Sequence, residues 1–222
     1  MIKIKNLTKE FERGGISELV LKGIDLTIER GQFVTITGPS GGGKSTLLNI
    51  IAMLMEPTSG SVTIDDEEIN YKKENHNDDL RRNKIGLIFQ NANLISCLSP
   101  MENLMVAMDN DKSYKEKKEE AKRLLESVGL KNKIKADVSS LSGGEAQRVA
   151  IVRSLVNKPS ILLCDEPTGA LDSNNGKRVM ELLLNIKKKN NATLIIVTHD
   201  KRIADMGERR LFLEDGEIRE LS

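Results

Sequence analysis

The chain has 222 residues, enough to bury one large hydrophobic core or two small ones. Its 34 basic and 33 acidic residues leave a net charge of +1, so no global basic field draws it to nucleic acid or to an anionic membrane. Only two cysteines, Cys97 and Cys164, are present, which favours a reducing compartment over a fold built on disulfides.

The predicted elements, taken in chain order, begin with an antiparallel sheet. Residues 2–4 and 21–28 alternate between apolar and polar side chains, as half-exposed antiparallel strands do. The opening MIKIKNLTKEFERGG lacks the apolar core of a signal peptide. Residues 33–37 form a short apolar run typical of a buried parallel strand, and residues 45–55 follow with a helical pattern. Residues 72–79 are polar, and we expect a surface loop there.

Strands and helices continue to alternate in the second half of the chain. Further buried strands are predicted over residues 85–89, 161–164 and 193–198, with a helix over residues 176–189. No apolar run reaches the roughly 18 residues needed to span a bilayer, so we expect a soluble chain. This order predicts an α/β fold with a mainly parallel sheet and an N-terminal antiparallel β-subdomain.

The middle of the chain differs from the rest because it is mainly helical. It includes the charged segment 113–133, in which apolar residues recur at helical spacing among lysines and glutamates. We expect an inserted α-helical subdomain over about residues 91–159. One domain would then span residues 1–222, with its core and antiparallel sheet at about 1–90 and 160–222.

A glycine-rich stretch between the strand at 33–37 and the following helix carries the first chemical signal. It fits G-x-x-x-x-G-K-[ST], with a strand before and a helix after, the context that confirms a P-loop and predicts a P-loop NTPase core. Backbone N–H groups of such a loop cradle phosphate oxygens, with Lys44 reaching the β- and γ-phosphates and Ser45 ligating Mg²⁺. A glycine-rich turn without a ligand is the alternative. The ATP-binding residues predicted here are Gly38, Pro39, Ser40, Gly41, Gly42, Gly43, Lys44, Ser45 and Thr46.

Polar residues follow the carboxyl ends of three predicted strands, where ligands bind in parallel sheets. Asp165 is placed to hold Mg²⁺, and Glu166 to orient and deprotonate an attacking water. His199 follows the strand at 193–198 and is either structural or a sensor of the γ-phosphate. Gln90 also ends a strand and could contact Mg²⁺ or water.

A second phosphate-binding helix start is predicted far along the chain from the first. It comprises Leu141, Ser142, Gly143, Gly144 and Glu145. Taken alone, this stretch could be a helix N-cap and nothing more. In order with the P-loop, Gln90, Asp165-Glu166, Ala170-Leu171-Asp172 and His199, it makes the whole chain resemble the ATPase subunit of an ABC transporter.

The resemblance implies several functional properties. ATP and Mg²⁺ would be the cofactors, and Ser142, Gly143 and Gly144 would close over ATP bound to the P-loop of a second copy. Phe11, in the sheet near the N-terminus, would stack on adenine, an interaction worth about 1–3 kcal/mol by analogy with base stacking. Ala170, Leu171 and Asp172 match the D-loop that follows the catalytic carboxylates.

Four stretches are similar to the MacB/LolD/FtsE branch of the family, namely GPSGGGKSTLLNII, LRRNKIGLIFQ, LSGGEAQRVAIVRSL and DEPTGALDS. Two positions depart from the pattern: Glu145-Ala146 stands where glutamines are commoner, and Ala92 replaces an aromatic residue in the segment that contacts the membrane partner. Because the sequence stops soon after Asp215-Gly216-Glu217, we expect it to lack the regulatory extension of some sugar importers.

The sequence therefore predicts an ATP-hydrolysing subunit that drives an integral membrane permease of the four-span MacB or FtsX kind. It would form an ATP-dependent homodimer in the cytoplasm, peripheral on the inner face of the cell membrane, and bind no nucleic acid. The alternatives are an FtsE-like ATPase that controls cell-wall hydrolysis, a nucleic-acid-linked ABC ATPase, and an inactive binding module. We further expect apolar residues of segment 91–100, Leu94 among them, to line a groove for a short helix of the partner.

Overall fold

An antiparallel sheet at the N-terminus wraps one side of the molecule. The computed structural model describes residues 1–109 and 111–221. The antiparallel sheet has the strand order β2-β1-β4-β5. Its strands are β1 (Ile2–Arg13), β2 (Ile16–Ile28), β4 (Ser59–Ile64) and β5 (Glu67–Glu68).

A second sheet forms the centre of the fold and has the order β10-β9-β3-β8-β7-β6. All of its neighbouring strands pair in parallel except β10, which returns antiparallel beside β9. The strands are β3 (Phe33–Thr37), β6 (Ile85–Ile88), β7 (Ile161–Asp165), β8 (Thr193–Val197), β9 (Arg209–Glu214) and β10 (Glu217–Leu221).

Both faces of β3, β6, β7 and β8 are largely buried, which is why these four strands are almost entirely apolar, whereas β9 and β10 at one edge carry charged residues. Alternate residues of one strand join two different hydrophobic cores. Leu163 belongs to the first core, between the central sheet, the antiparallel sheet and α1 (Lys44–Ile51). Leu162 belongs to the second core, between the central sheet and α6 (Ser173–Asn190). The short α7 (Lys201–Ala204) adds Ile203 to the second core. The carboxyl ends of β3, β8, β7 and β6 are thereby aligned along one edge.

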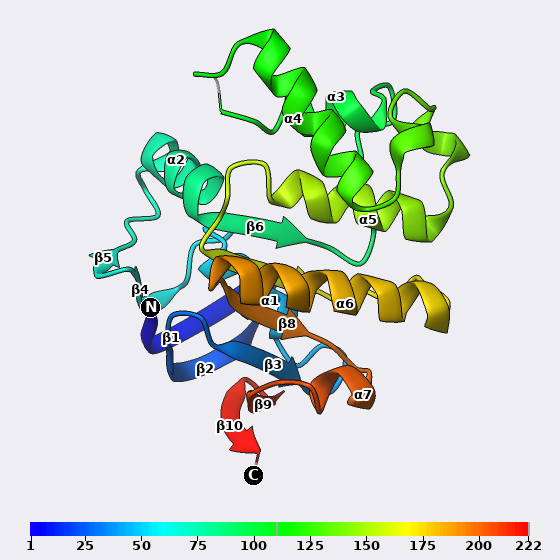
Figure 1. Ribbon diagram of the computed structural model, residues 1–222. Helices are drawn as coiled ribbons and strands as arrows, with labels where there is room; N and C mark the ends of the chain where they lie inside the picture. The colour runs from blue at the N-terminus through cyan, green and yellow to red at the C-terminus, as the bar shows by residue number, and fades with distance from the viewer. Residues whose placement is uncertain (110, 222) are drawn as a thin grey trace.

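Three further helices form a separate layer above the central sheet (Figure 1). They are α3 (Pro100–Met105), α4 (Tyr114–Ser127) and α5 (Gly143–Ser154), joined by 3₁₀ turns at Lys131–Lys133 and Val138–Ser140. A third core holds them together, with Leu104, Leu125 and Val149 fully buried in it. Ala121 and Leu125 face this core, as the helical spacing predicts.

The predicted fold class is confirmed, because an antiparallel sheet, a mainly parallel sheet and helices are all present. The predicted surface loop over residues 72–79 is wrong, since α2 (Glu74–Lys84) begins within it. This helix has no apolar stripe and is held by polar contacts instead. Asn77 Nδ2 donates to the Asn70 carbonyl at 3.0 Å, and Arg81 Nη1 donates to the Met53 carbonyl at 3.2 Å.

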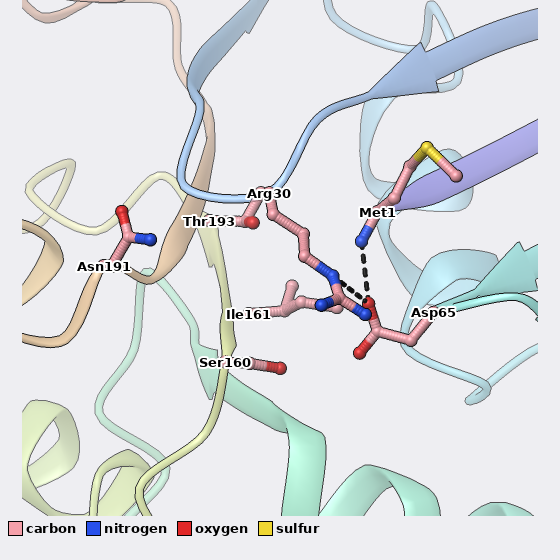
Figure 2. Close-up of a pocket in the computed structure, with 7 residues that line it drawn as sticks. All are labelled: Met1, Arg30, Asp65, Ser160, Ile161, Asn191 and Thr193. Carbon is pink, nitrogen blue, oxygen red and sulfur yellow. Dashed lines mark hydrogen bonds and ion pairs between the residues drawn. The ribbon is translucent and has the colours of Figure 1, made fainter.

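The amino-terminal edge of the central sheet holds a small cavity beside Asp65 (Figure 2). The Met1 ammonium and Arg30 Nε both donate to Asp65 Oδ1, at 2.7 and 2.9 Å. These contacts join the start of β1 to the turn after β4 and to the loop before β3. Over the part of the chain that the structure describes, every helix is too short or too polar to cross a membrane.

Candidate nucleotide site

The glycine-rich loop between β3 and α1 has a backbone that only glycine tolerates. Gly38 has φ 145°, and a Cβ on it would lie 1.9 Å from the carbonyl oxygen of Leu213. Gly43, at φ 92°, caps α1 without a side chain. The first N–H groups of a helix have no partners within it, and their dipoles favour a negative charge. The loop therefore presents backbone donors at a helix start.

Lys44 lies folded over this loop. Its Nζ donates to the carbonyl of Gly38 at 3.0 Å and to that of Pro39 at 2.7 Å. An ammonium group has three donors, so one remains for a ligand oxygen after these two contacts. The two carbonyls fix the charge of Lys44 at the mouth of the loop.

A cavity of about 350 Å³ opens between the loop and the carboxyl edge of the central sheet. The strand order places β3 beside β8 and β8 beside β7, so residues distant in sequence meet there. The lining residues are Ser40, Gly41, Gly43, Lys44, Ser45, Thr46, Gln90, Asp165, Glu166, Val197 and His199. The structure thus brings most of the predicted P-loop residues together with Gln90, the two carboxylates and the histidine.

Glu166 and His199 lie side by side in the cavity. His199 Nδ1 lies 2.8 Å from Glu166 Oε1. Glu166 has φ 49°, and its N–H donates to the carbonyl of Val197 at 2.9 Å. Its side chain is 17% exposed against 71% for His199, so the histidine holds a recessed carboxylate from the solvent side.

The donor set suits Mg²⁺. Ser45, Gln90 and Asp165 line the cavity with a hydroxyl, an amide and a carboxylate. Mg²⁺ prefers oxygen ligands and is usually held by one or two carboxylates together with phosphate oxygens. Cys164, the neighbour of Asp165, is buried, and burial raises the pKa of its thiol, so it stays neutral and acts as a core residue. The residues present therefore fit a magnesium ion bound with a phosphate ligand.

Three predicted parts of the site lie outside this cavity. Phe11 is not among the described residues that line the cavity. Its side chain is partly buried on β1, with Lys9 Nζ 5.1 Å from the centroid of the phenyl ring. Gly38, Pro39 and Gly42 belong to the loop but do not line the cavity. The signature residues Leu141, Ser142, Gly143, Gly144 and Glu145 are also elsewhere, at the start of α5.

The signature stretch begins a helix with an exposed cap. Ser142 N donates to Glu145 Oε2 at 2.8 Å, and Glu145 N donates to Ser142 Oγ at 3.3 Å. This reciprocal pair is a capping box. Glu145, which departs from the family pattern, therefore has a defined structural contact, and Lys133 Nζ lies 3.9 Å from its other oxygen.

The predicted D-loop residues lie beside Glu166 rather than in the same cavity. Leu171 and Asp172 line a neighbouring hollow that also includes Glu166 and His199, whereas Ala170 is exposed. Asp172 caps α6, accepting from the N–H groups of Asn174 and Asn175 at 3.0 Å. The backbone and side-chain hydrogen bonds from Asn175 hold the pKa of Asp172 below its usual range.

Two side chains that the sequence did not single out anchor the segment around Gln90. Gln147 and Arg153, both on α5, donate to backbone carbonyls of Phe89, Ala92 and Asn93. Their position in the helix that follows the signature gave no indication of these contacts. Val197 also lines the cavity, through the end of β8.

Comparison with known proteins points to one family. The family model described as ABC transporter matches residues 21–169. The uncharacterised ABC transporter ATP-binding protein MJ0796 of Methanocaldococcus jannaschii is 43% identical over 98% of this chain and 95% of its own length. A solved dimeric structure of that cassette, in a post-hydrolysis state bound to ADP and Pi, matches with a TM-score of 0.92. The match covers 100% of this chain and 98% of the other, at 42% identity.

Two further relatives carry functional names. The lipoprotein-releasing system ATP-binding protein LolD 1 of Chlorobium chlorochromatii is 41% identical over 98% of this chain and 90% of its own length. The macrolide export ATP-binding/permease protein MacB of Mannheimia succiniciproducens is 47% identical over 98% of this chain. The chain spans only 34% of that MacB, whose name describes a permease as well as an ATP-binding part.

Proposed function

This chain belongs to the ABC transporter family as an ATP-binding subunit, and we propose that it hydrolyses ATP to drive a membrane partner. The observation that carries the proposal is the cavity in which the P-loop faces Gln90, Asp165 and the Glu166–His199 pair. A binding module without activity would not need a recessed carboxylate held by a histidine at the place where the γ-phosphate would lie.

The residues of the cavity have separate roles in the proposed hydrolysis of ATP. Lys44 and the N–H groups at the start of α1 bind the phosphates, and Ser45, Gln90 and Asp165 hold Mg²⁺. When bound, the metal neutralises charge on the phosphate oxygens. Glu166 accepts a proton from water as the water oxygen attacks the γ-phosphorus and the bond to ADP breaks. His199 holds the Glu166 carboxylate toward that water. Phe11 is proposed to stack on the adenine.

The signature stretch supports a two-copy mechanism. Ser142 and Gly143 are exposed and lie outside the P-loop cavity of their own chain. We infer that they close over ATP bound to the P-loop of a second copy, in a two-fold dimer with two nucleotides at its interface. The D-loop residues Ala170, Leu171 and Asp172 would meet the partner copy beside them. The moving unit in this proposal is the helical subdomain at about residues 91–159.

One experiment tests hydrolysis and assembly together. Glu166→Gln keeps the shape of the side chain but removes most of its basicity, so turnover should fall by about 10²–10⁴-fold. ATP binding should persist, and analytical ultracentrifugation of this variant should show monomers without nucleotide and dimers with MgATP. Near-normal hydrolysis would refute the role of Glu166, and a monomer at saturating ATP would refute the dimer.

The partner is proposed to be an integral membrane permease, which would hold this subunit at the cytoplasmic face of the cell membrane. MacB and LolD are named for macrolide export and lipoprotein release. By analogy, the work done would be export, lipoprotein release or resistance to antimicrobial peptides, with a partner of the four-span kind. Copurification of the chain with its membrane protein from mild detergent would identify the partner. A partner bound to cell-wall hydrolases would instead favour the FtsE-like alternative.

A groove between α2 and α5 is the proposed docking site. It measures about 380 Å³ and is lined by Asp78, Arg81, Arg82, Ile85, Leu87, Phe89, Ala107, Arg153, Ser154, Val156 and Asn157. This location replaces the groove expected from segment 91–100. Leu94 instead packs against the core of the helical layer, and Met101 is buried within that core. Its apolar residues and the exposed Arg82 suit an amphipathic helix that carries acidic residues.

A further inference from the structure

Two side chains of α5 fasten the backbone on both sides of Gln90. On one side, Gln147 Nε2 donates to the Phe89 carbonyl at 2.9 Å. On the other, Arg153 Nη1 donates to the Asn93 carbonyl at 2.8 Å, and Nη2 donates to the Ala92 carbonyl at 3.0 Å. The three bonds join segments about 60 residues apart in sequence.

These contacts are costly to break. Gln147 is 2% exposed, so loss of its partner would leave a buried amide without a hydrogen bond. The guanidinium of Arg153 is planar and presents its donors as a rigid fork, which here spans two successive carbonyls. Burial lowers the pKa of Arg153, which reflects how far this charge is withdrawn from water. Phe89, Ala92 and Asn93 therefore follow any displacement of α5.

The same helix begins at the signature stretch. Ser142 is its N-cap, and the twelve residues Gly143–Ser154 extend from it about 18 Å at 1.5 Å per residue. A hydrogen-bonded helix of this length moves as one body. The helix α5 and its three hydrogen bonds thus connect the segment that carries Gln90, at the P-loop cavity, to Ser142, at the proposed dimer interface.

We propose that Gln147 and Arg153 are positioning residues that convert a movement of Gln90 toward the γ-phosphate into a movement of the signature stretch. This inference rests on the proposed function, because it concerns ATP-driven closure of two copies. Neither side chain touches nucleotide in it. Both act by making the Gln90 segment and α5 one mechanical unit.

The first test uses Arg153→Lys in the Glu166→Gln background, where ATP persists. Lysine keeps the charge but loses the fork that binds two carbonyls at once. We expect binding of a fluorescent ATP analogue to the monomer to stay within 2-fold of the parent. The monomer–dimer dissociation constant in MgATP, measured by analytical ultracentrifugation, should rise about 10-fold, within the 5–150-fold range of allosteric couplings. Arg123→Lys is the matched control, because Arg123 is exposed on α4 and pairs only locally with Glu120.

A double-mutant cycle separates positioning from a merely structural role. If Arg153 acts through Gln90, then Arg153→Lys should change dimerisation less than 2-fold when Gln90→Ala is already present. The inference is overturned if Arg153→Lys raises the monomer–dimer dissociation constant equally with Gln90 present and with Gln90→Ala. It is also overturned if a folded Arg153→Lys protein dimerises as well as the parent. If Arg153→Lys does not fold, Gln147→Met provides the same cycle, since it removes the donor to Phe89 while nearly keeping the side-chain volume.

The failures of the two proposals are distinguishable. If Glu166→Gln alone does not dimerise with MgATP, the proposed function fails at that step. If Glu166→Gln dimerises and both Arg153→Lys and Gln147→Met dimerise equally well, only the positioning role fails.

Discussion

Lys44 shows how one side chain can be prepared for a ligand by its own loop. Two of its donors are already engaged with the carbonyls of Gly38 and Pro39, which fixes the ammonium before any phosphate arrives. A side chain that is ordered in advance loses less conformational entropy on binding. The loop and its lysine therefore act as a single phosphate-binding unit.

Replacement of Lys44 by alanine should weaken nucleotide binding itself. The variant loses a charge that faces the phosphates, whereas Glu166→Gln loses only basicity. We expect the dissociation constant for ATP to rise at least about 10-fold, in line with charge-assisted hydrogen bonds worth about 1.5–3 kcal/mol. Isothermal titration calorimetry measures it directly. Unchanged affinity would remove Lys44 from the phosphate site.

Asp65 illustrates a residue whose charge serves stability and not catalysis (Figure 2). Partial burial acts to raise the pKa of Asp65, but the hydrogen bond and charge of the Met1 ammonium and the charge of Arg30 outweigh it. The pKa is therefore held below its usual 3.8. A carboxyl group with a depressed pKa stabilises the fold above its unfolded pKa, and the contribution is lost as pH falls through the folded value.

Asp65→Asn should therefore lower the free energy of unfolding at neutral pH. The gap between parent and variant should narrow as the pH falls below about 3.8 and close once the pH is below the lower pKa of folded Asp65, because both proteins then carry a neutral side chain at this position. Urea unfolding at a series of pH values measures the gap. A gap that does not change with pH would mean that Asp65 acts through shape alone.

The residues of the candidate site could be predicted from sequence where a motif fixes both spacing and context. Ser45, Asp165, Glu166 and His199 all line one cavity, because each follows a strand that the apolar runs reveal. Gln147 and Arg153 could not be predicted in the same way. Their partners are backbone carbonyls, which any residue supplies, so the sequence holds no complementary side chain to signal the contact.

At the scale of elements, three helices begin with the same capping box. Ser99, Ser113 and Ser142 each accept from the N–H three residues on, and Glu102, Glu116 and Glu145 accept from the cap N–H in return. These boxes add a second local signal to the helical spacing of apolar residues, from which the sequence predicts that this layer is helical. The helix α2 was missed because its cap, Lys73, gives no such signal and Leu80 is its only apolar residue.

The shared geometry allows structural and functional effects of Ser142 to be separated. Ser113→Ala and Ser142→Ala should each cost about 1 kcal/mol of unfolding free energy, since each removes the same cap. Only Ser142→Ala should also weaken ATP-driven dimerisation in the Glu166→Gln background, because only Ser142 is proposed to meet nucleotide. Denaturant unfolding and analytical ultracentrifugation provide the two readouts. Equal dimerisation by both variants would leave Ser142 as a helix cap alone.

At the scale of the whole molecule, the two predicted phosphate-binding helix starts belong to different layers. The P-loop starts α1 in the core, and the signature starts α5 in the helical layer (Figure 1). The order of motifs indicated that both exist. Their separation within one chain depends on where the helical layer lies relative to the sheet. Packing within the three hydrophobic cores determines that position, and no single motif encodes it.

Coupling to the partner should depend on the groove between these layers. Arg82 is exposed at its rim, while Leu87, Phe89 and Val156 form much of its floor. Phe89 is also the residue whose carbonyl Gln147 holds, so a helix seated in the groove would lie against the segment that carries Gln90. Partner binding and ATP-driven closure would then favour the same arrangement, each by about 1–3 kcal/mol.

Arg82→Glu should leave ATP hydrolysis by the isolated subunit largely intact and strongly reduce its stimulation by the copurified partner. Charge reversal at the rim opposes an acidic helix, whereas the Arg82 side chain lies outside the P-loop cavity. Stimulation of the parent should also weaken as salt rises, because exposed charges are screened beyond about 10 Å at 0.1 M. Lys115→Glu, an equal charge reversal at an exposed position on α4, is the control and should behave like the parent. Full stimulation of Arg82→Glu would place the docking site elsewhere, and loss of its basal hydrolysis would assign Arg82 to the fold.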